Sequence, residues 1–163
     1  MLCKIDNYFR ILYRLSGYIA AIFLILVATF ILTGIASRIF GFYIRGLAEY
    51  SGYCMAAASF LALAYTFGEK GHIRITLFLE KSNKTIRRYL ELWCLSIATF
   101  FSGFLSFYFL KMLMISFNFQ ERSEGADEIL IWIPQVSVAL GSTIFFICVL
   151  HNFILLILKK NNV

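Results

Sequence analysis

Side chains capable of catalysis or metal binding are few in this sequence. The chain has four cysteines and two histidines, at Cys3, Cys54, Cys94, Cys148, His72 and His151. The cysteines lack the CxxC spacing of zinc and redox motifs, and isolated cysteines in apolar segments usually serve as small packing residues. A two-haem anchor needs facing histidine pairs, whereas only His151 lies in an apolar segment, which favours a packed or interfacial histidine. We therefore expect no enzyme activity, no metal and no cofactor.

The charged residues avoid the long apolar segments. Charge-free stretches run over 15–37, 50–68, 92–110 and 129–158, and the one proline, Pro134, lies near the start of the last. Ionisable residues inside a membrane are costly and usually functional. A proton-coupled transporter needs an embedded carboxylate, and sodium-coupled transporters typically build their sites from broken helices. The sequence therefore favours a packing subunit over a chain that transports solute by itself.

The composition places these segments in a membrane. The chain is 61% hydrophobic, with a mean hydropathy of +0.81, far outside the range of soluble domains. A spanning helix needs about 20 apolar residues, because lipid cannot satisfy the backbone polar groups. We predict an all-α, single-domain membrane protein over residues 1–163, with spans at about 15–37, 50–68, 92–110 and 133–158. Pro134 suits the first turn of the last helix, where its missing N–H costs nothing.

Lysine and arginine are divided unequally between the two sides of this arrangement. Four of them, Arg38, Arg45, Lys111 and Arg122, are expected in the first and third loops. The other eleven lie in the N-terminal tail, the second loop and the C-terminus: Lys4, Arg10, Arg14, Lys70, Arg74, Lys81, Lys84, Arg87, Arg88, Lys159 and Lys160. Because basic loops stay in the cytoplasm, both termini are predicted to be cytoplasmic, in the bacterial inner membrane. The basic residues then meet lipid headgroups and not nucleic acid.

Small residues recur along the second and third predicted helices. Ala58 and Ala62 illustrate the small-xxx-small spacing that lets helix backbones approach closely. The third helix carries many phenylalanines, which suit lipid or a partner helix better than a substrate site. We expect these two helices to contact other helices, either within this chain or in a larger partner. Downstream of the second helix, the segment 82–93 favours an interfacial helix that continues into the third span.

Several local motifs resemble the small permease (DctQ-like) subunit of tripartite ATP-independent periplasmic (TRAP) transporters. They run in order as Arg45-Gly-Leu-Ala-Glu-Tyr-Ser-Gly, an apolar helix, Gly71-His72-Ile73-Arg74-Ile75 and Ile86-Arg87-Arg88. Glu49, His72 and Arg88 occupy the family's acidic helix start, its Gly-His-Ile turn and its basic helix start. The proline-led opening of the last helix, Ile131-Trp132-Ile133-Pro134-Gln135, is similar as well.

The resemblance implies partners and a role. The small subunit would scaffold a large multi-helix permease that holds the substrate and sodium sites, and would help dock a periplasmic solute-binding protein. The implied process is secondary active uptake, usually symport of an organic acid with sodium. Three alternatives remain open at this point: an autonomous small oligomeric transporter, a membrane-anchor subunit of another complex, and a membrane-embedded redox or lipid-modifying enzyme.

Candidate residues for a partner or lipid interface follow from these patterns. They are Glu49, Ala58, Ala62, His72, Arg74, Arg87, Arg88, Trp132 and Pro134. Each also has a simpler explanation. Glu49 suits the positive N-terminal dipole of the second helix, His72 and Arg74 suit terminal carbonyls and headgroups, and Trp132 suits the aromatic belt at the membrane surface.

Overall fold

The structure is a computed structural model that describes residues 2–68, 84–125 and 128–158. Four helices account for most of these residues: α1 (Leu2–Ile39), α2 (Leu47–Gly68), α4 (Lys84–Phe119) and α5 (Trp132–Leu158). Within the described ranges, extended pairing is limited to one isolated bridge between Arg122 and Leu130. The predicted all-helical architecture is therefore confirmed for this part of the chain.

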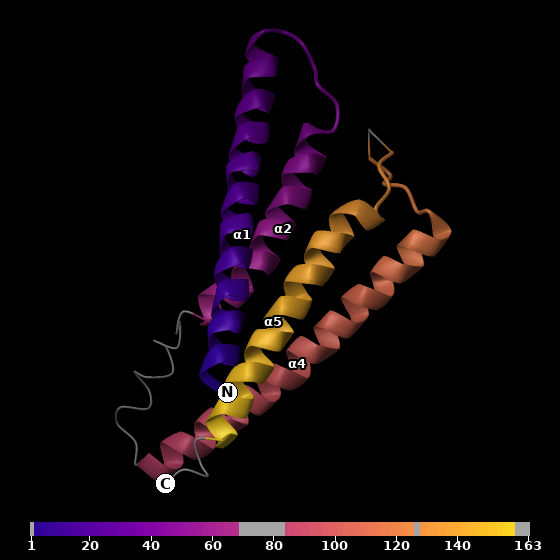
Figure 1. The fold of residues 1–163 in the computed structure, drawn as a ribbon. Coiled ribbons are helices and arrows are strands. Elements are labelled where there is room, and N and C mark those ends of the chain that lie inside the picture. The colour runs from indigo at the N-terminus through magenta and orange to yellow at the C-terminus, as the bar shows by residue number, and fades with distance from the viewer. Residues whose placement is uncertain (1, 69–83, 126–127, 159–163) are drawn as a thin grey trace.

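The helices form two hairpins that lie side by side (Figure 1). α1 packs along α2, α4 packs along α5, and α2 packs along α5 to join the hairpins, whereas α1 barely touches α5. The spatial order is thus α1, α2, α5, α4, which is a row and not a closed bundle. The outer helices α1 and α4 each keep a broad face that no other described helix covers.

Within the described residues, three helical segments are long and apolar enough to cross a membrane: Tyr8–Ile39, Tyr89–Phe119 and Trp132–Ile157. α2 is the exception, because small and polar residues such as Gly52 and Ser59 lower its hydropathy. At 1.5 Å per residue, α1 and α4 are about 57 and 54 Å long, well beyond a hydrocarbon core of about 30 Å. Both helices therefore extend past the apolar layer.

The helices continue beyond the predicted spans. Arg38 forms part of the last turn of α1, and Lys111 lies inside α4, although we expected both in loops. Helix α4 continues because residues 112–119 contain no glycine or proline to end it. It also begins at Lys84, so most of the predicted interfacial segment forms its first turns, while Ser82 lies outside the described residues.

Small residues bring the helix backbones together inside this chain. A Cβ added at Gly141 of α5 would lie 2.8 Å from the carbonyl carbon of Phe60 in α2. Gly103 of α4 lies similarly close to the ring of Phe146 in α5. Ala58 of α2 is buried. The close helix packing expected from the small-residue spacing is confirmed.

The most buried cluster lies near the N-terminal end of α1 and combines Tyr13, Ala64 and Cys148. The Cys148 thiol lies 3.6 Å from the carbonyl oxygen of Ala64. His151 packs on Phe9, with ring centroids 4.6 Å apart, and its Nδ1 lies 3.5 Å from the Tyr13 hydroxyl. The packing roles expected for His151 and Cys148 are confirmed, whereas Cys94 is exposed on α4 and is not packed against the described helices. This cluster packs α1, α2 and α5 against one another at one end of the row.

Candidate partner and lipid interface

The outer side of α4 carries a continuous set of exposed aromatic side chains. We call this the α4 aromatic face, and it consists of Trp93, Phe100, Phe101, Phe104, Phe107 and Tyr108. Phe100, for example, is 70% exposed. Neighbouring rings contact one another, as in the Phe104–Tyr108 pair, whose centroids are 4.5 Å apart. The face therefore presents a large apolar surface to whatever surrounds this chain.

The opposite side of α4 is small and polar. Ser102 and Ser106 are buried toward α5, and the Ser106 hydroxyl lies 3.1 Å from the Thr143 hydroxyl. In lipid, helices gain from close approach and from hydrogen bonds, since lipid tails are as apolar as leucine. This explains why α4 turns its small residues toward α5 and its rings outward.

The connection between α4 and α5 is an acidic turn, described over residues 120–125 and 128–131, which we call the acidic hairpin. Its two sides are joined by backbone hydrogen bonds from Ser123 N–H to Ile129 C=O at 2.7 Å and from Ile131 N–H to Glu121 C=O at 3.0 Å. Arg122 and Glu128 form an exposed ion pair at 3.6 Å. The acidic hairpin is thus a defined surface for most of its length.

The acidic hairpin is attached to the first turns of α2. The Tyr53 hydroxyl lies 3.0 Å from the Ser123 hydroxyl. The Glu49 carboxylate lies directly against Gly125, where an added Cβ would overlap its oxygens. Glu49 is the third residue of α2, close to the positive end of the helix dipole. The Glu49 carboxylate therefore stabilises the start of α2 and also contacts the acidic hairpin that connects α4 and α5.

Comparison with known proteins identifies the class of this chain. The family model described as tripartite ATP-independent periplasmic transporters, DctQ component, matches residues 26–159. The chain belongs to this family. The TRAP small subunit described here is accordingly a membrane component of a transporter, and its family is not enzymatic. No curated protein and no solved structure matches the chain.

The candidate interface residues occupy different places in the TRAP small subunit. Ala58 is 5% exposed and covered by the chain itself, and Ala62 is half-buried. Pro134 lies in the first turn of α5, as predicted. His72 and Arg74 lie outside the described residues. Arg87 and Arg88 lie in the first two turns of α4, and their side chains are not among those described.

Trp132 begins α5 and packs edge-on against Phe117 of α4, with ring centroids 5.5 Å apart. Its indole Nε1 is buried and makes no hydrogen bond to any described residue, and the same holds for Oε1 of Gln135. Trp132 thus fixes the corner between α4 and α5. The contact between the Trp132 and Phe117 rings could not be predicted from the sequence, because we expected Phe117 to lie in a loop.

Chemically, the described side chains make packing contacts within the chain and leave a large apolar surface uncovered. Among them, no group of three His, Cys, Asp or Glu residues is placed to hold a metal ion. Cys54, Cys94 and Cys148 are free thiols. The features that sequence reasoning missed are the contacts of Glu49 and Tyr53 with the acidic hairpin. The participants are at least 70 positions apart in the sequence, and no local pattern connects them.

Proposed function

We propose that this chain is a rigid scaffold for the large permease of a sodium-coupled TRAP system, and that the α4 aromatic face is its main seam with that permease. The single observation that carries the proposal is the uncovered face of α4. Among the described helices, α4 packs mainly against α5, and one ring contact joins Phe109 of α4 to Phe60 of α2. The rest of the α4 surface is left open by the described residues, and we propose that lipid and another protein cover it.

The chemistry of the uncovered faces favours α4 over α1 and α2 as the seam. Exposed residues of α1 are chiefly aliphatic, such as Ile25 and Leu32, and suit acyl chains. Aromatic residues are enriched in protein interfaces. Ala58 of α2 is already covered, so it offers no free surface. Lys111 is exposed on α4, and a charge on a membrane helix usually marks a polar partner or the headgroup layer.

The acidic hairpin is the proposed docking surface for the periplasmic binding protein. Glu121, Glu124 and Glu128 are exposed there, and Arg122 is paired with one of them. A charged surface of one sign speeds the approach of an oppositely charged partner and orients it. We infer that the binding protein presents a basic patch to this hairpin, and that the solute and the sodium ions pass through the large permease.

Copurification tests the α4 seam. Phe100, Phe104 and Phe107 share one side of α4, since positions four and seven apart lie on the same helix face. Changing all three to alanine should reduce recovery of the coexpressed large permease about tenfold or more, because aromatic anchors dominate interface energies. Recovery on the tagged small subunit is the measurement.

A matched triple on α1 is the control for this experiment. Ile22, Ile25 and Leu32 are similarly exposed and share one face, so changing them to alanine should leave permease recovery unchanged. Each variant must first be shown to elute as monodisperse protein. Full recovery with the α4 triple, or loss with the α1 triple instead, would place the seam elsewhere.

We further propose four membrane crossings, with both termini in the cytoplasm. α2 is about 33 Å long at 1.5 Å per residue, which matches a hydrocarbon core of about 30 Å. Reporter fusions within 69–83 and after Lys160 should therefore give cytoplasmic signals. A cysteine introduced at Glu124 should react with an impermeant reagent in spheroplasts. A periplasmic signal from either fusion would contradict four crossings.

A further inference from the structure

A groove of about 340 Å³ opens between the end of α1 and the start of α2. This volume lies in the range of about 300 to 1,000 Å³ typical of small-ligand sites. Its wall includes the connection between the helices, where Gly41 and Gly46 adopt φ values of 77° and 76°. These left-handed conformations favour glycine and let the chain turn sharply from one helix into the next.

The lining of the groove changes character along α1. Phe30, Ile31 and Ile35 make its apolar part, which lies toward the middle of the helix. Arg38 and Ser51 line the end near the helix connection. An apolar wall that leads to a cation at the end of a membrane helix matches the layout of a phospholipid. The acyl chains of such a lipid lie deeper in the membrane than its phosphate.

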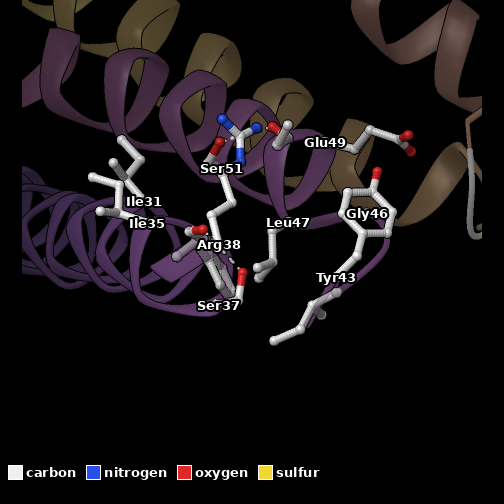
Figure 2. Close-up of a pocket in the computed structure, with 13 residues that line it drawn as sticks. Ile31, Ile35, Ser37, Arg38, Tyr43, Gly46, Leu47, Glu49 and Ser51 are labelled. Atoms are coloured by element: carbon white, nitrogen blue, oxygen red, sulfur yellow. Dashed lines mark hydrogen bonds between the residues drawn. The ribbon is translucent and has the colours of Figure 1, made fainter. Parts of the chain in front are cut away.

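The guanidinium of Arg38 has no counter-ion in the part of the chain that the structure describes. Among the described residues, the Arg38 side chain makes no hydrogen bond or ion pair. Figure 2 shows it extending from α1 toward the first turns of α2, beside Ser51, while the Glu49 carboxylate points away. Glu49 is held instead against Gly125. Glu49 also lines the groove, but its carboxylate lies against Gly125 of the acidic hairpin and points away from Arg38.

We propose that this groove binds one phospholipid, with an acyl chain against Phe30, Ile31 and Ile35 and the headgroup phosphate on Arg38. Arginine is suited to phosphate because its planar guanidinium donates two parallel hydrogen bonds. The start of α2, with Gly46 and Leu47, lines the same groove, and the positive end of a helix dipole favours an anion. The inference rests on the proposed membrane placement of α1 and α2 and is independent of the α4 seam.

The test uses the small subunit copurified with its large permease and depleted of lipid in detergent. Dioleoyl phosphatidylglycerol is titrated in, and retained lipid is counted by native mass spectrometry. Arg38→Gln should weaken retention about tenfold or more, since hydrogen bonds to charged groups are among the strongest. Arg45→Gln is the matched control, because Arg45 is exposed in the same connection but does not line the groove. Lipid retention by the Arg45→Gln variant should stay within about twofold of that of the unaltered protein.

Two further arms separate lipid binding from simple anion binding and from failed assembly. Gly34 lines the groove and has room for a side chain, so Gly34→Leu should fill the apolar part and displace lipid while Arg38 stays in place. Excess inorganic phosphate should not displace the lipid. Equal losses in both arginine variants, unchanged retention in Arg38→Gln and Gly34→Leu, or displacement by phosphate would each overturn the proposal. Permease recovery in the same samples shows separately whether each variant still assembles with the permease.

Discussion

Replacing Gly141 with leucine is expected to separate the two helical hairpins and to abolish recovery of folded protein. A Cβ at this position would lie 2.8 Å from the carbonyl carbon of Phe60 and 2.9 Å from the backbone nitrogen of Leu61. Backbone atoms cannot rotate aside, so the whole of α2 would have to move. Because α2 and α5 make the main contact between the hairpins, little else would hold them together.

A graded series makes this expectation quantitative. Gly141→Ala should destabilise the protein by about 1 to 3 kcal/mol, the usual range for overpacking, and Gly141→Leu by more. Gly52→Leu is the control, since nothing lies within 4 Å of a Cβ added at Gly52. Thermal unfolding in detergent and size-exclusion recovery are the measurements. A Gly141→Leu protein that unfolds at the same temperature as Gly52→Leu would show that α2 and α5 do not pack as described.

The existence of the four helices could be predicted, but their ends could not. Charge-free stretches identify the segments that lipid can surround, and each lies within an observed helix or nearly so. Charge does not end a helix, however. Long basic side chains such as Lys111 can reach the headgroup layer from a helix that continues past the apolar core. Helix ends are instead marked by local backbone features, such as the left-handed Gln120 after α4 and Gly41 after α1.

The partners of the small residues could not be predicted either. The spacing around Ala58 correctly indicates that another helix approaches closely, because small side chains remove the steric barrier. It contains no information on whether that helix belongs to the same chain. The structure shows that the chain itself covers Ala58, while the larger rings of α4 stay uncovered. The order of the helices in the row decides which residues are covered. That order depends on contacts between residues that are distant in the sequence.

The candidate interface was predicted only in part for the same reason. Glu49 was singled out as the acidic residue at the start of the second helix, and its place in the first turn of α2 agrees. Its contact with Gly125 depends on the fold of the acidic hairpin, which brings Ser123 and Gly125 against the first turns of α2. The phenylalanines of the third helix were expected to face lipid or a partner, and their exposure agrees.

Solute uptake into proteoliposomes tests most directly the central claim that this chain is an accessory subunit. The predicted spans contain no Asp, Glu, Lys or Arg, and no proline interrupts them, so the chain alone lacks the usual means of coupling transport to an ion gradient. Liposomes with the small subunit, the large permease and the binding protein should take up solute when a sodium gradient is imposed. Omitting the small subunit should reduce uptake to background. Sodium-dependent or proton-dependent uptake by liposomes that contain only this chain would contradict the account.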